Sequence, residues 1–96
     1  MRLRWTDGAV ENLQSAHDFL EAENPKAAWD AVSRILSAVE VLERFPQMGR
    51  VGRVEGTREL VVTGTPFLVA YRLKSEVIQI LAVLHAARKW PKRFKV

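Results

Sequence analysis

Three residues in the second half of the chain have side chains suited to acid–base and phosphate chemistry. His85 ends an apolar run, and its unperturbed pKa near neutrality would let the imidazole give or take a proton. Arg72 and Arg58 could bind a phosphate group through charge-assisted hydrogen bonds. Because side chains alternate between the two faces of a strand, we expect Arg72 and His85 to face the same way, with Arg58 within reach. The three residues would then form a basic cleft.

Each of these residues also has a structural interpretation. His85 could cap its strand or bond a backbone carbonyl, and Arg72 could pair with Glu59 or Glu76 across the sheet. Arg58 and Glu59 could form an ordinary edge pair, worth a few tenths of a kcal/mol. Glu59 is an alternative base, although alternation places it on the face away from Arg58.

The C-terminal tail carries the best candidates for contact with a target molecule, namely Arg88, Lys89, Trp90, Lys92, Arg93 and Lys95. Residues 46–96 contain ten Lys or Arg and three Asp or Glu, which gives a net charge of +7. Residues 1–45 contain five Lys or Arg and eight Asp or Glu, which gives a net charge of −3. A basic half of this kind attracts nucleic acid or an acidic protein segment. Alternatively, the tail is a solvated end, or Trp90 pins it to its own domain.

Two amphipathic helices are expected to support these candidates. Thr6 or Asp7 caps the first, in which Val10, Leu13, Ala16 and Leu20 recur at helical spacing. This helix is expected to end near residues 22–23. Asn24-Pro25 starts the second helix, and Pro46 is expected to stop it. Its apolar stripe comprises Ala28, Val32, Ile35, Val39 and Leu42, widened by Ala31, Ala38 and Phe45. The short link predicts an antiparallel helical hairpin, with Trp5 and Trp29 in the core.

Four strands complete the predicted fold. Residues 2–5 alternate polar and apolar, as in a short edge strand. The runs 59–62, 67–73 and 77–84 are joined by turns too short for anything except antiparallel pairing. In the middle run, Phe67, Val69, Tyr71 and Leu73 are expected to face the core. We therefore predict an α+β fold, an N-terminal helical hairpin on one face of a small antiparallel β-sheet, in the order strand, helix, helix and three strands.

Composition limits the remaining possibilities. The 96 residues predict one domain, 1–96, and the absence of cysteine excludes disulfides and thiolate metal sites. His17 and His85 fall in different elements without a ligand cluster, so we expect no metal. The chain has no glycine-rich phosphate loop, so we expect no cofactor. No apolar run approaches the roughly 18–20 residues of a membrane span, which predicts a soluble, cytoplasmic protein without a membrane partner.

Residues 56–73 and 77–91 resemble the RelE/ParE superfamily of bacterial type II toxin–antitoxin toxins. The similarity lies in Arg58-Glu59-Leu60, Tyr71-Arg72 and His85-Ala86-Ala87-Arg88, in this order and spacing. The helical half is similar as well, with Asn24-Pro25 opening the second helix and Phe45-Pro46-Gln47-Met48-Gly49 closing it. The family's fold, a helical hairpin against an antiparallel sheet, agrees with the fold expected from periodicity.

The resemblance implies a toxin that a cognate antitoxin neutralises by wrapping a disordered segment around it. We expect that segment to be acidic and amphipathic, and to lie over the basic cleft or across the helices. RelE- and YoeB-like members of the family cut mRNA in the ribosome, whereas ParE-like members poison DNA gyrase and are not nucleases.

The two branches make different demands on the site. In a nuclease, the catalytic roles would fall to His85, Arg72 and Arg58, as base or acid and as phosphate-binding cations. RelE-like members carry a catalytic Tyr near the C-terminus, and YoeB-like members often have a Tyr directly after the histidine. Here Ala86 follows His85, and Tyr71 is the single tyrosine. The ending His85-x-x-Arg88 is more like the ParE pattern, which favours inhibition of DNA gyrase, with ribosome-dependent mRNA cleavage as the alternative.

Overall fold

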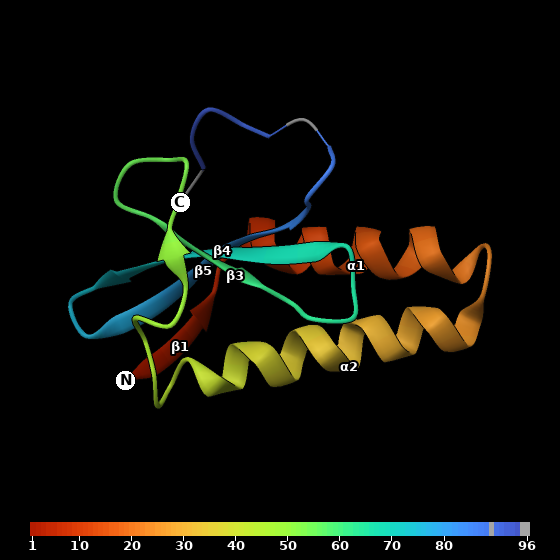
Figure 1. Ribbon diagram of the computed structural model, residues 1–96, viewed down its shortest axis with the longest axis horizontal. Helices are drawn as coiled ribbons and strands as arrows, with labels where there is room; N and C mark the ends of the chain where they lie inside the picture. Colours follow the sequence, from red (N-terminus) through yellow and green to blue (C-terminus); the bar gives the residue numbers. More distant parts are fainter. Residues whose placement is uncertain (89, 95–96) are drawn as a thin grey trace.

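Two helices cover one face of a five-stranded sheet in the computed structural model, which describes residues 1–88 and 90–94 (Figure 1). The elements are β1 (Arg2–Trp5), α1 (Asp7–Glu21), α2 (Pro25–Val41), β2 (Arg50–Val51), β3 (Arg58–Val61), β4 (Phe67–Lys74) and β5 (Val77–His85). The order of elements and the helical hairpin confirm the predicted α+β fold.

The sheet has the strand order β1-β5-β4-β3-β2. Strands β3, β4 and β5 form the expected antiparallel meander. The sheet as a whole is mixed, however, because β1 pairs in parallel with β5 at the edge of the sheet, in the register Arg2 opposite Val77. The sequence patterns also did not predict β2, a two-residue strand that pairs with Arg58 and Glu59 of β3.

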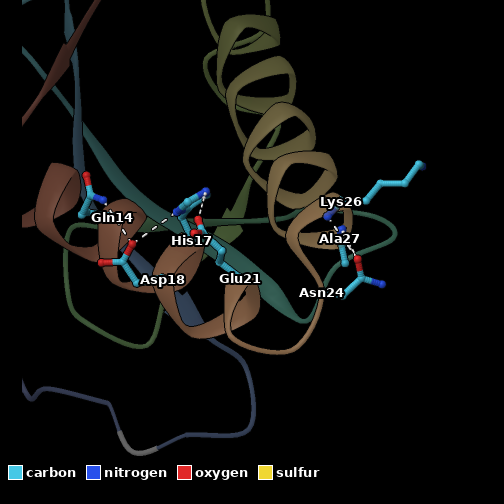
Figure 2. A network of polar contacts seen from close by, with 7 residues as sticks. All are labelled: Gln14, His17, Asp18, Glu21, Asn24, Lys26 and Ala27. Carbon is cyan, nitrogen blue, oxygen red and sulfur yellow. Dashed lines mark hydrogen bonds and ion pairs between the residues drawn. The ribbon is translucent and has the colours of Figure 1, made fainter.

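Local capping explains where both helices begin. The Thr6 hydroxyl accepts a hydrogen bond from the Ala9 backbone nitrogen at 3.2 Å and donates one to the Ile80 carbonyl at 2.9 Å, so one side chain caps α1 and ties it to β5. Asn24 caps α2 by accepting from the backbone nitrogens of Lys26 and Ala27 (Figure 2).

The end of α2 differs from the prediction. The helix ends at Val41, five residues before Pro46, and hydrogen-bonded turns continue the chain through residues 42–45. As a consequence Phe45 does not extend the buried stripe, and its side chain is 57% exposed. Leu42 still packs into the core, together with Ile35 and Val39.

The core lies between the hairpin and the sheet. Ala9 and Ala16 of α1 and Ile35 and Val39 of α2 pack on the helix-facing residues of the strands, which include Val69, Tyr71 and Ile80. Trp5 packs against this core as expected. Trp29 does not, because it is 63% exposed, and its ring meets the His17 ring of α1 at a centroid distance of 4.7 Å.

His17 lies on α1 beside two acidic side chains. Its Nδ1 is 3.3 Å from Asp18 Oδ1, and its Nε2 is 3.1 Å from Glu21 Oε2 (Figure 2). These contacts stay within α1, and the described residues contain no group of three or more His, Cys, Asp or Glu arranged to hold a metal ion.

Candidate functional site

Strand β5 contains a bulge that decides which way His85 points. Tyr71 pairs with Ile80 and Ala70 pairs with Ala82, so Leu81 is an extra residue without a partner of its own. The alternation therefore shifts by one residue after Ile80. Phe67 is directly opposite His85, which places His85 on the face that the helices cover.

The predicted basic cleft is wrong for this reason. Arg72 pairs with Gln79 before the bulge and lies on the opposite face of the sheet from His85. Arg58 is directly opposite Tyr71, a core residue, and therefore lies on the helix-covered face. The structure thus separates Arg72 from both His85 and Arg58.

His85 is held by its own turn at the end of β5. Its Nδ1 accepts a hydrogen bond from the Ala87 backbone nitrogen at 3.1 Å, and its ring meets the Phe67 ring edge-on at a centroid distance of 5.6 Å. Because Nδ1 is the acceptor, the neutral imidazole carries its proton on Nε2. The side chain is half-buried and can act as a hydrogen-bond donor.

Arg72 has a side-chain partner that the sequence did not suggest. Its Nε donates to Gln79 Oε1 at 2.6 Å, instead of pairing with Glu59 or Glu76. Around it, a small hollow is lined by Leu81, by the loop 54–57, and by Arg93 and Phe94 of the tail. The second face of the sheet is thus approached by the C-terminal segment.

Arg58 makes structural contacts. Its Nη1 donates to the carbonyl oxygens of Gly49 at 2.6 Å and Gln47 at 3.2 Å, which fastens the loop after α2 to β3. Glu59 lies on the other face, as alternation predicts, and does not pair with Arg58.

Glu59 organises the loop between β2 and β3. Its side chain is almost fully buried, and its Oε1 accepts from Arg50 Nε at 3.3 Å and Arg50 Nη2 at 3.2 Å. Its Oε2 accepts from the Arg53 backbone nitrogen at 2.7 Å. A buried carboxylate needs such partners, and here they order the loop that carries Arg53.

Tyr71 is buried in the core, as predicted. Its hydroxyl donates to the Pro46 carbonyl at 2.8 Å and accepts from the Gly49 backbone nitrogen at 2.8 Å. Burial raises the pKa of Tyr71 above 10.0, while the Gly49 hydrogen bond and the nearby Arg58 charge act in the opposite direction. A fully buried, bonded phenol is not available to a substrate.

The C-terminal segment turns back from β5 toward the β2–β3 loop (Figure 1). There the Arg53 guanidinium stacks on the Trp90 ring at 3.9 Å from its centroid, and Trp90 is half-buried. Trp90 thus contacts its own domain. Lys92 and Arg93 are exposed, and so is Arg88, whose guanidinium lies 4.8 Å from the Phe19 ring centroid. Lys89 and Lys95 lie outside the described residues.

An exposed apolar surface borders the outer edge of β3. Because β2 pairs only with Arg58 and Glu59, the edge of β3 beyond them has no strand partner in the described chain. Beside it is a groove of about 590 Å³ between β3 and α2. Four apolar residues here are 38–59% exposed, and we call them the β3-edge surface: Val41, Phe45, Met48 and Val61. Exposed apolar side chains clustered at an open strand edge are typical of protein interaction surfaces.

None of the helices that the structure describes is long and apolar enough to cross a membrane.

Comparison with known families gives a match that covers most of the chain. Residues 3–90 match the family described as the ParE toxin of the type II toxin–antitoxin system parDE. Among named relatives, a Sinorhizobium fredii protein called "Putative toxin Y4kP" is 41% identical over 90 residues, which span 94% of this chain and 93% of the relative. Toxin RelE2 of Caulobacter vibrioides is 31% identical over 84 residues, which span 88% of this chain and 93% of the relative.

Solved structures share the fold. A chain of the chromosomal ParDE toxin–antitoxin system of P. aeruginosa superposes with a TM-score of 0.82 at 32% identity, covering 88% of this chain and 95% of its own length. A chain of the toxin–antitoxin complex RelBE2 of Mycobacterium tuberculosis superposes with a TM-score of 0.56 at 25% identity, with the same coverage of both chains.

Proposed function

Since this chain belongs to the ParE toxin family of type II toxin–antitoxin systems, we propose that it arrests growth by inhibiting DNA gyrase and that a cognate antitoxin neutralises it. The family places it within the RelE/ParE superfamily, whose branches differ in target. The positions of its candidate residues favour the gyrase branch.

The separation of His85 from Arg72 carries this proposal. Cleavage of RNA at a 2′-hydroxyl requires a base, an acid and cations gathered around one phosphate group. Here the imidazole and the Arg72 guanidinium lie on opposite faces of the sheet, and Arg58 is bonded to two backbone carbonyls. The single tyrosine hydroxyl is buried. This arrangement supports a toxin that acts by binding its target.

The proposed target-binding residues are the basic side chains of the tail, Arg88, Lys89, Lys92 and Arg93, together with Trp90. Arg53 extends this charge onto the β2–β3 loop, because its guanidinium lies on the Trp90 ring. Positive charges clustered on one part of a surface favour binding to an acidic partner surface and increase the rate of association with it.

The β3-edge surface supports the antitoxin part of the proposal. Its apolar side chains and the open strand edge together suit an extended partner segment that adds main-chain hydrogen bonds and inserts side chains into the adjoining groove. The antitoxin part fails if co-expression of the protein encoded by the adjacent reading frame does not relieve growth arrest.

The test is to induce the chain in a bacterium and to follow DNA, RNA and protein synthesis separately. We expect an early fall in DNA synthesis and filamentous cells, both unchanged by His85→Ala. The double variant Lys92→Ala/Arg93→Ala should lose activity at least several-fold. Arg2→Ala/Arg4→Ala is the matched control, because it also removes two exposed cations and should change little.

The alternative function gives a different set of results. A ribosome-dependent nuclease would stop translation at once and leave cleaved mRNA, and His85→Ala would abolish both effects. Circular dichroism of the purified His85→Ala variant would establish that any loss does not come from unfolding. That set of results would replace gyrase inhibition with mRNA cleavage.

A further inference from the structure

A pocket between α1 and the end of β5 lies on the helix-covered side of the sheet. Its volume is about 190 Å³. Polar side chains reach it from both elements, namely Asn12 and Ser15 from α1, His85 from β5, and Arg88 just beyond. Phe19 and Phe67 supply aromatic walls. We call this hollow the α1–β5 pocket.

Hydrogen bonds within the fold determine what the pocket offers to a ligand. Asn12 Oδ1 accepts a hydrogen bond from the Val83 backbone nitrogen at 3.2 Å, so the amide NH₂ is the group of Asn12 that can donate to a ligand. His85 Nδ1 accepts from the Ala87 backbone nitrogen, so the neutral ring presents Nε2–H. The bulge at Leu81 is what turns His85 into this pocket.

Arg88 adds a positive charge at the mouth. Its guanidinium lies over the Phe19 ring, 4.8 Å from the centroid, and its N–H groups are donors that suit an acceptor at the mouth of the pocket. None of the described side chains that line the pocket is acidic. With Ser15 as a hydroxyl that can donate, the polar groups form a set of donors and one cation, which fits an anionic acceptor.

The volume limits the size of that acceptor. Sites for cofactors and drug-sized molecules usually enclose about 300–1,000 Å³, so a cavity of about 190 Å³ is too small for a nucleotide. It is large enough for one carboxylate side chain, with an apolar neighbour against the phenylalanine rings.

We propose that the α1–β5 pocket binds a carboxylate side chain of the cognate antitoxin, flanked by an apolar residue. The inference rests on the proposed function, since it assigns part of the antitoxin contact. The pocket opens beside α1, whereas Arg72 and the hollow under Arg93 lie on the opposite face of the sheet. The antitoxin would thus hold the toxin at a site apart from the Arg53–Trp90 contact.

A double-mutant cycle on the toxin–antitoxin complex tests the proposal. Each Asp and Glu of the antitoxin's toxin-binding segment is changed in turn to Asn or Gln, and each variant is paired with wild-type toxin and with Arg88→Ala. Calorimetry gives the dissociation constant of every pair. Lys74→Ala is the matched control, because Lys74 is an exposed cation at the other end of β4 from Phe67.

We expect Arg88→Ala to weaken binding at least tenfold, and Lys74→Ala less than twofold. Substitution of one antitoxin carboxylate should weaken binding by the same factor. Combining that substitution with Arg88→Ala should weaken binding no further, which corresponds to a tenfold coupling in the dissociation constant, or about 1.4 kcal/mol. Because Arg88 is exposed and its one described side-chain contact is the Phe19 ring, its substitution should lower the melting temperature by no more than a few degrees.

Two results would overturn the inference in different ways. If Arg88→Ala adds independently to every carboxylate substitution, the pocket does not take an antitoxin carboxylate, and the proposed function stands. If the wild-type chain does not bind the protein encoded by the adjacent reading frame at all, the antitoxin part of the proposed function fails and the inference fails with it.

Discussion

The Tyr71 hydroxyl lies 2.8 Å from the Gly49 backbone nitrogen and accepts its hydrogen bond in the buried core. The same hydroxyl donates to the Pro46 carbonyl, so one side chain of β4 fixes both ends of the segment 46–49 that leads into β2. Gly49 leaves no room for a side chain here, because a Cβ atom would lie 2.7 Å from the Tyr71 ring. The position of β2 depends on this contact.

Removal of the phenol oxygen should therefore destabilise the fold. Tyr71→Phe leaves the Gly49 N–H and the Pro46 carbonyl without their partner, which costs about 1–3 kcal/mol of unfolding free energy. Urea unfolding measures the loss. Ser33→Ala, which removes an exposed hydroxyl from α2, should change stability by less than about 0.5 kcal/mol. A Tyr71→Phe effect as small as that of Ser33→Ala would show that the loop is held by other contacts.

The Tyr71 phenol should also ionise at a higher pH than an exposed tyrosine. Burial raises its pKa above 10.0 in the folded protein, so the folded state keeps the phenol proton at pH values where the unfolded chain has lost it. The stability that this proton contributes is complete below about pH 10 and is lost as pH rises through the folded-state pKa. Because the chain has a single tyrosine, phenolate absorbance at 295 nm reports it directly.

The titration midpoint of the folded protein is expected above pH 10. Urea unfolding should give the matching result, in which the stability advantage of wild type over Tyr71→Phe shrinks as pH rises above 10. A midpoint at or below pH 10 would contradict the buried, hydrogen-bonded phenol.

The contact of Arg53 with Trp90 should hold the tail against the β2–β3 loop. Trp90 Nε1 is buried, and a cation–π contact of this kind is worth about 0.5–1 kcal/mol near a surface. Arg53→Ala should raise the hydrogen-exchange rate of the Trp90 indole N–H by roughly two- to fivefold, as that free energy implies. The indole of Trp29, which is 63% exposed, is the internal reference and should not change. Equal exchange of Trp90 in both proteins would mean that Arg53 does not fix the tail.

Much of the fold follows from local sequence signals. Thr6 and Asn24-Pro25 start the two helices at the expected residues, because capping depends only on the next few backbone N–H groups. The parallel pairing of β1 with β5 joins residues some 75 positions apart, and no local pattern specifies it. Strand β2 has two residues, too few to show any alternation.

The candidate site was harder to predict, and the bulge at Leu81 is the reason. Residues 80–84 are all apolar, so no polar side chain marks where the alternation shifts. The bulge reverses the expected orientation of His85 relative to Arg72 and places His85 in the lining of the α1–β5 pocket. The partners of Arg58 are backbone carbonyls of a loop, which side-chain patterns do not reveal.

The most direct test of the central claim is supercoiling of relaxed plasmid by purified DNA gyrase in the presence of the purified chain, with bacterial ribosomes programmed with mRNA assayed in parallel. We predict that the wild type and His85→Ala inhibit gyrase equally, that Lys92→Ala/Arg93→Ala inhibits it several-fold less, and that none of them cuts mRNA. Unimpaired gyrase together with mRNA cleavage that requires His85 would contradict the proposed function.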